Sequence, residues 1–258
     1  MALTIAVAGK GGTGKTTVAA LSIRYITEVI RKSVSAIDAD PNASLGMALG
    51  VTVEKTIADL RDDVIERRMG IPPGMSKEAY IEYCIEECII ENEKYDLLTM
   101  GRPEGPKCYC YVNNLLRKYM DRVGNSYPYV VIDNEAGMEH LSRRTTNNVD
   151  LLLLVCEPTI IGVVSAQRII KLASELPIIV KEKAIILNRV TKDGLSPAIQ
   201  NKLDEFGMDV SLSIAYDHEI YDAASNGKSL LKIHEQNETF NAIGNLLRNY
   251  INVEVMSK

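Results

Sequence analysis

Short apolar runs, separated by longer mixed segments, set the pattern of this chain. They lie at 3–8, 33–38, 95–100, 127–133, 151–156 and 184–187, with a last strand and its loop at 211–217. Apolar runs of this length are typical of strands buried on both faces of a sheet. Helices are expected between them, as at 15–31 and 160–175. The pattern predicts an α/β fold with a mostly parallel central sheet and helices on both faces.

The other segments add helices but no second domain. Residues 51–70 are charged and predict a surface helix with loops, and the end of the chain is expected to be helical to near Tyr250. A further apolar stripe follows a candidate N-cap at Ser76 and consists of Ile81, Cys84, Ile85, Cys88 and Ile89. Its spacing predicts one face of a helix, so its cysteines read as small buried hydrophobes rather than a metal pair. With no repeat or linker, residues 1–258 are expected to form a single domain.

Composition and charge narrow the classes of function. The chain has 258 residues, and its 29 basic and 34 acidic side chains give a net charge of −5. This balance argues against nucleic acid as the main partner. No apolar run approaches the roughly 20 residues that a membrane span requires, so we expect a soluble, cytoplasmic protein without a membrane partner. Five cysteines in such a chain indicate free thiols or metal ligands rather than disulfides.

A glycine-rich loop carries the clearest chemical signal. Residues 9–17 read Gly-Lys-Gly-Gly-Thr-Gly-Lys-Thr-Thr, between a predicted strand and a predicted helix. This is the context of a P-loop, whose backbone N–H groups surround the phosphates of a nucleotide. Lys15 is expected to reach the β- and γ-phosphates, and the Thr16 hydroxyl to bind Mg²⁺. We therefore predict an ATPase that uses ATP, ADP and Mg²⁺ and binds nucleotide through Gly11, Gly12, Thr13, Gly14, Lys15, Thr16 and Thr17.

Two later strand ends complete the predicted nucleotide site. Asp133 ends an apolar run, as a carboxylate that contacts Mg²⁺ through water does in P-loop enzymes, and Gly137 follows in the place of a phosphate-sensing switch. Asn188 and Arg189 follow the run at 184–187, where the paired donor and acceptor of an Asn side chain can read an adenine edge. Tyr216 and Asp217 lie in the loop expected to cover the base.

The loop also contains an additional lysine, Lys10. In this form it resembles the deviant Walker A motif of the MinD/Mrp/nitrogenase-iron-protein group of ATPases. The resemblance implies a homodimer in which Lys10 crosses to the nucleotide of the partner copy. It also implies that Asp40, in the segment Asp38-Ala39-Asp40-Pro41, holds the attacking water, while Asp38 supports the Mg²⁺ shell or Asp40 itself. The simpler alternative is that these two carboxylates cap the following turn.

Cys108 and Cys110 form a Cys-x-Cys motif after the Pro- and Gly-rich segment 101–107. In an extended segment, side chains two residues apart share a side, so both sulfurs are expected to face one point. Two thiolates are half of a four-ligand shell, and a two-fold axis supplies the other half. Together with Ala136-Gly137, Glu139-His140-Leu141 and Glu157-Pro158, the motif resembles the ATPases of this group that mature carbon monoxide dehydrogenase. This implies one Ni²⁺ or Zn²⁺ ion per dimer and carbon monoxide dehydrogenase as the client.

Several alternatives stay open at this point. The two thiols could be unrelated surface cysteines. The chain could be an iron–sulfur reductase like the nitrogenase iron protein, although residues 133–140 contain no cysteine. It could also be a positioning ATPase related to MinD or ParA, although its C-terminal segment carries little positive charge.

Overall fold

The computed structural model describes residues 2–60, 72–102, 126–135, 148–176 and 178–251. These residues form an eight-stranded sheet of order β3-β4-β2-β5-β1-β6-β7-β8. Every pairing is parallel except that of β3 with β4. The strands are β1 (Leu3–Ala8), β2 (Val34–Ala39), β3 (Ile89–Glu91), β4 (Tyr95–Thr99), β5 (Tyr129–Asn134), β6 (Asn148–Cys156), β7 (Ile179–Val190) and β8 (Val210–Ala215). The predicted α/β fold is confirmed.

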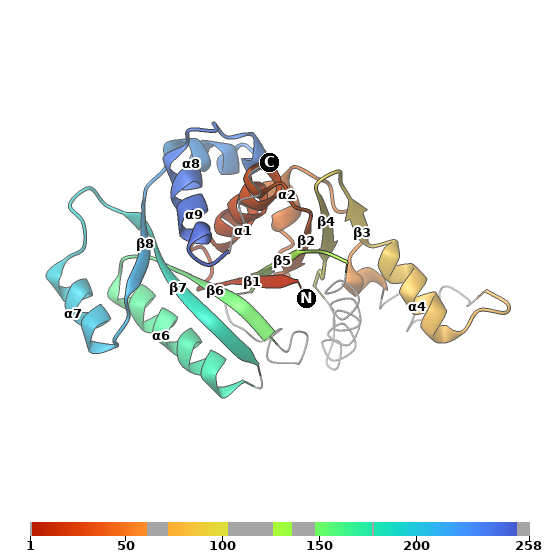
Figure 1. Cartoon of the computed structure of the whole chain (residues 1–258), viewed down its shortest axis with the longest axis horizontal. Coiled ribbons are helices and arrows are strands. Elements are labelled where there is room, and N and C mark those ends of the chain that lie inside the picture. The colour runs from red at the N-terminus through yellow and green to blue at the C-terminus, as the bar shows by residue number, and fades with distance from the viewer. Residues whose placement is uncertain (1, 61–71, 103–125, 136–147, 177, 252–258) are drawn as a thin grey trace, which may run out of the picture.

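Helices cover both faces of the sheet (Figure 1). One layer contains α1 (Lys15–Arg24), α2 (Leu45–Leu49), α8 (His218–Ser225) and α9 (Glu238–Arg248). The other contains α4 (Lys77–Glu86), α6 (Ile160–Glu175) and α7 (Pro197–Glu205). The central strands β1, β2, β5 and β6 are covered on both sides and buried along most of their length, which is why they read as largely apolar runs.

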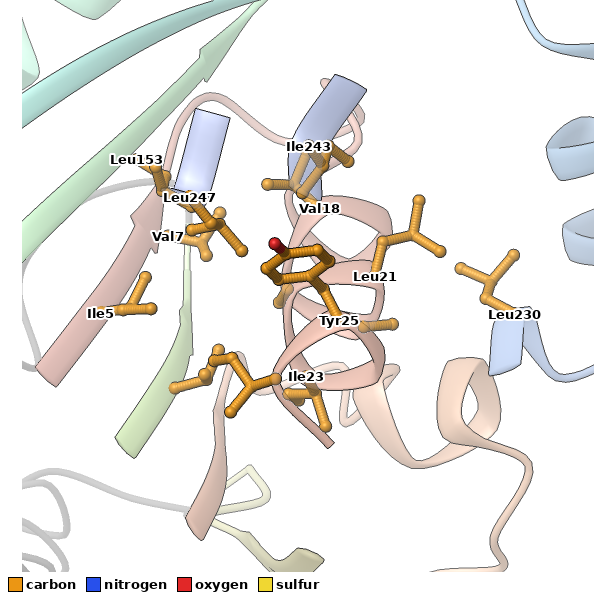
Figure 2. Close-up of a cluster of buried hydrophobic side chains, with 14 of the residues drawn as sticks. Ile5, Val7, Val18, Leu21, Ile23, Tyr25, Leu153, Leu230, Ile243 and Leu247 are labelled. Atoms are coloured by element: carbon orange, nitrogen blue, oxygen red, sulfur yellow. The ribbon is translucent and has the colours of Figure 1, made fainter. Parts of the chain in front are cut away.

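The layer that contains α1 and α9 has the core shown in Figure 2. Ile5 and Val7 of β1 meet Leu21 of α1 and Ile243 of α9, and all four side chains are fully or almost fully buried. Tyr25 lies between the two helices and accepts a hydrogen bond from Arg248 Nε at 2.6 Å. This packing fixes α1, the helix whose first residue follows the phosphate-binding loop.

Four segments differ from the sequence prediction. The strand predicted at 184–187 is longer, because β7 extends from Ile179 to Val190 and contains Asn188 and Arg189. The helix expected at 15–31 changes at Tyr25 into the π-helix η1 (Tyr25–Ile30) and ends at Arg31, whose φ is +59°. The segment 51–70 was expected on the surface, but Ile57 and Leu60 are buried in the core, because they pack beneath the sheet. Ile89 was assigned to a helical stripe but begins β3, since α4 ends at Glu86 and the chain then pairs antiparallel with β4.

Other local expectations are confirmed. The Ser76 hydroxyl accepts from Ala79 N at 3.1 Å and caps α4. Cys84 and Cys88 are buried within the core. After α8 the chain forms the 3₁₀ turn η3 (Leu230–Lys232) and then α9. Within the described part of the chain, no helix is long and apolar enough to span a bilayer.

We predict that Gly244→Ala destabilises the fold by about 1–3 kcal/mol, because an added Cβ would lie 2.5 Å from the Tyr25 ring. This overpacking should outweigh the gain in helix propensity of roughly 1 kcal/mol. Urea unfolding measures the change. Asn245→Ala, at the exposed neighbouring position, is the control and should leave stability unchanged or slightly raised. Equal or greater stability of Gly244→Ala would contradict this account of the core.

Candidate functional site

The phosphate-binding loop leaves the sheet at the carboxyl end of β1 and enters α1. Its shape depends on close approach: a Cβ at Gly9 would lie 2.1 Å from the Val155 carbonyl oxygen of β6. Gly14 caps α1 in the left-handed region, with φ +98°. Lys15 is 5% exposed at the first turn of the helix. The loop therefore leads into a helix N-terminus at which Lys15 is buried, the arrangement that phosphate binding requires.

The predicted magnesium ligands meet in the structure. The Thr16 hydroxyl donates to Asp133 Oδ2 at 2.6 Å. Asp133 is fully buried, and its Oδ1 has no hydrogen-bond partner among the described residues. The Ser44 hydroxyl lies 3.2 Å from Thr16 Oγ1, a contact that sequence reasoning missed because Ser44 belongs to no recognisable motif. A hydroxyl beside an unsatisfied carboxylate oxygen fits the preference of Mg²⁺ for oxygen ligands.

Asp38 and Asp133 stand side by side because β2 and β5 are paired in register at these residues. The pKa of Asp38 is raised to about 7, chiefly by burial and next by the nearby Asp133 carboxylate. Burial also raises the pKa of Asp133 to about 6, although the Thr16 hydroxyl and Lys15 oppose the shift. Two buried carboxylates with few positive neighbours favour a bound cation or a bound proton.

The switch segment after β2 is folded by its own carboxylates. Asp38 accepts from Asp40 N at 3.2 Å and from Leu45 N at 2.8 Å. Asp40 Oδ1 accepts from both the backbone N–H and the side-chain amide of Asn42. Asp38 thus shapes the segment that holds Asp40, and it also satisfies the start of α2. Both readings made from the sequence, support of Asp40 and capping of the next turn, are compatible with this geometry.

The residues expected to surround the base line one cavity of about 90 Å³. Asn188, Arg189, Tyr216 and Asp217 meet Gly14 and Thr17 of the loop there. Sequence reasoning missed Val18, Ile220 and Tyr221, which line the same cavity. Val18 follows Gly14, and Ile220 and Tyr221 follow Asp217, at the three- or four-residue spacing that puts side chains on one face of a helix, and this spacing could have indicated them. The Asp217 carboxylate also makes structural hydrogen bonds: it accepts from Ile220 N, Asn237 Nδ2 and Thr239 Oγ1.

The remaining predicted site residues divide into two groups. Lys10 is exposed beside the phosphate site. Cys108, Cys110, Gly137 and His140 lie outside the described residues, so the thiolate site stays a prediction. Among the residues the structure does describe, no group of three or more His, Cys, Asp or Glu side chains is arranged to hold a metal ion.

The loop, the magnesium ligands and the base cavity along one edge of a parallel sheet define a P-loop nucleotide-binding protein. The chain belongs to the family described as CobQ/CobB/MinD/ParA nucleotide binding domain, whose model matches residues 4–231. Members of this family hydrolyse ATP, and this chain is an ATPase that uses ATP and Mg²⁺.

Individual relatives extend this comparison. An uncharacterized ATP-binding protein of Methanocaldococcus jannaschii is 41% identical over 96% of this chain and 98% of its own length. The carbon monoxide dehydrogenase accessory protein CooC of Rhodospirillum rubrum is 32% identical over 87% of this chain and 88% of its own length. A solved ParA family ATPase from Chlorobium tepidum covers 95% of this chain and 98% of its own, with a TM-score of 0.71 and 19% identity, which shows the fold.

The paired carboxylates predict how stability depends on pH. Their pKa values in the folded state are raised, so the folded protein holds these protons more tightly than the unfolded chain does. In EDTA, the free energy of unfolding should therefore fall as the pH rises from about 4 through about 7. Asp133→Asn should weaken this fall and raise stability at pH 8 relative to the native protein.

Urea unfolding at pH 5 and pH 8 measures both effects. Asp193→Asn, at an exposed position, is the matched control and should keep the native pH dependence. Addition of Mg²⁺ with ATP should restore stability at pH 8 in the native protein and not in Asp133→Asn. Identical pH dependence in the native protein and in Asp133→Asn would show that the Asp38–Asp133 pair does not cause the loss of stability at high pH.

Proposed function

We propose that this chain is a metal-handling ATPase that matures carbon monoxide dehydrogenase. Two copies close around ATP, gather one Ni²⁺ or Zn²⁺ ion as cargo between them through Cys108 and Cys110 of each copy, and pass the ion to the client. The observation that carries the proposal is the similarity to CooC along most of both chains, in a chain that has a Cys-x-Cys motif. Zinc is included because thiolates bind it well.

The topology supports a link between nucleotide and thiolates. Thr99, the last residue of β4, pairs with Asp38, and Asp38 pairs in turn with Asp133. The segment that carries the two cysteines therefore begins at the same edge of the sheet as the magnesium ligands. Gly101 holds this exit close to the core, because a Cβ there would lie 2.3 Å from Thr56 Oγ1. A structural change at the phosphates can therefore reach the start of the cysteine-containing segment through the neighbouring strands β5, β2 and β4.

Exposure and charge support a role for Lys10 in the partner's site. Its neighbour in the loop, Lys15, is buried at the phosphate position, whereas Lys10 is exposed. A second copy that faces this edge would bring its own Lys10 to the γ-phosphate, where positive charge stabilises the transition state. Asp40 holds the attacking water in the same proposal. Water cleaves the γ-phosphate from ATP, and release of the resulting inorganic phosphate removes the charge that Lys10 of the partner copy contacts, which loosens the dimer.

Mixing two inactive variants tests action across the interface. Lys10→Ala should bind ATP but lose roughly 10³-fold in turnover, the scale seen for a cation supplied in trans. Asp40→Ala should also be inactive. In an equimolar mixture, about half of the dimers contain one intact site, formed by Asp40 of one copy and Lys10 of the other, so about a quarter of native activity should return. If the mixture stays as inactive as its components, Lys10 does not act in trans.

Metal content tests the thiolate site. Cys108→Ala and Cys110→Ala should remove the bound metal, measured per dimer by elemental analysis after loading with Ni²⁺ and a non-hydrolysable ATP analogue. Nucleotide affinity should be preserved, because these residues lie outside the P-loop. Cys84→Ala, a buried thiol on α4, is the control and should keep full metal content. Unchanged metal content in the Cys108 and Cys110 variants would refute the proposal.

A positioning role like that of MinD or ParA is the second candidate, favoured by the match of the fold to a ParA family ATPase. It requires ATP-dependent binding to a large surface, either lipid or DNA. Co-sedimentation with anionic vesicles and DNA retention at low salt, each with ATP, separate it from metal handling. An iron–sulfur reductase would instead show the visible absorbance of a cluster.

A further inference from the structure

One side chain contacts the phosphate-binding loop from the base side. Asn188, near the end of β7, donates through Nδ2 to the backbone carbonyl of Thr13 at 2.8 Å. We propose that Asn188 is a positioning residue for the phosphate-binding loop as well as a reader of the base. The inference rests on the nucleotide site of the proposed function and not on its metal step, so failure of metal binding leaves it unaffected.

The orientation of the Asn188 amide is fixed on its other side. Its Oδ1 accepts from Arg189 N at 3.0 Å, and this leaves Nδ2 to face Thr13. Arg189 has φ +64°, a left-handed conformation that is uncommon for a residue with a side chain. Its guanidinium pairs with Glu157 Oε1 at 2.9 Å, which ties this irregular end of β7 to the residue that follows β6. The amide is therefore held in place before any nucleotide binds.

The contact continues into the loop. Thr13 is 2% exposed, and its hydroxyl donates to the Lys10 carbonyl at 2.9 Å. The Thr13 N–H approaches the same carbonyl at 3.3 Å. Gly14 makes room for the hydrogen bond between Asn188 and Thr13, because a Cβ at Gly14 would lie 2.4 Å from Asn188 Nδ2. Hydrogen bonds thus run without a break from Asn188 through Thr13 to the backbone of Lys10.

The two roles of Asn188 are compatible. A side-chain amide has two N–H donors, and its oxygen has two acceptor positions. One donor is used by Thr13 and one acceptor position by Arg189, which leaves one of each for the edge of an adenine in the adjoining cavity. Base recognition and the shape of the phosphate loop therefore depend on the same group.

A ligand without a base separates these roles. We would measure by calorimetry the affinity for Mg²⁺-ATP and for Mg²⁺-tripolyphosphate, which has the phosphates alone. Asn188→Ala should weaken tripolyphosphate binding by about 3- to 10-fold, the effect of one lost hydrogen bond to the loop. It should weaken ATP binding further, because the base contact is lost as well. Tripolyphosphate affinity equal to that of the native protein would overturn the proposal.

Tyr221→Ala is the matched control. Tyr221 lines the base cavity and packs against Tyr216 at a ring-centroid distance of 5.7 Å. This variant should lose affinity for ATP and keep its affinity for tripolyphosphate. An equal loss of tripolyphosphate binding in Tyr221→Ala would show that the loop responds to any change in the cavity, and would also overturn the specific role of Asn188.

A second variant covers the case in which Asn188→Ala unfolds at the assay temperature. Asn188→Asp preserves the volume and the acceptor for Arg189 N but places a carboxylate oxygen against the Thr13 carbonyl. It should weaken tripolyphosphate binding at least as much as Asn188→Ala. Thermal unfolding of each variant identifies the folded ones. If folded Asn188→Asp binds tripolyphosphate with native affinity, the positioning role of Asn188 is refuted.

Discussion

The pairing of Asp38 and Asp133 on neighbouring strands is the constraint on which the site depends. In-register parallel pairing of β2 and β5 places two buried carboxylates together, and burial raises both pKa values. Such a pair is stable only with bound protons, a cation or strong hydrogen bonds. Thr16 and the backbone N–H groups of Asp40 and Leu45 supply the hydrogen bonds, so helix, switch segment and metal position all meet at these acids.

The helix layer that contains α1 and α9 makes this arrangement rigid on one side. α1 begins at the phosphate loop and packs against both the sheet and α9, so its N-terminus has little freedom to move. The switch segment after β2, by contrast, is held by hydrogen bonds to Asp38 and Asp40 and by the short helix α2. A change in charge at the phosphates therefore acts on a segment held mainly by polar contacts, as expected of a nucleotide switch.

Much of this could be predicted because local patterns are strong at the nucleotide site. The loop sequence, the apolar run before it and the helix after it specify a P-loop without tertiary information. The course of residues 57–60 and 89–91 was not predictable in the same way. Ile57 and Leu60 lie in a charged stretch that looks exposed, and Ile89 continues a helical spacing that a three-residue strand interrupts.

The sequence by itself determined the fold class, the phosphate loop and the residues Thr16, Asp133 and Asn188 as site candidates, because each belongs to a motif with short-range meaning. Only the tertiary structure decided that Ser44 contacts Thr16, that Tyr221 lines the base cavity and that Asn188 bonds to Thr13. These contacts join residues that are 28 to 175 positions apart along the chain, or in separate elements. The order of strands in the sheet, which no local pattern encodes, brings them together.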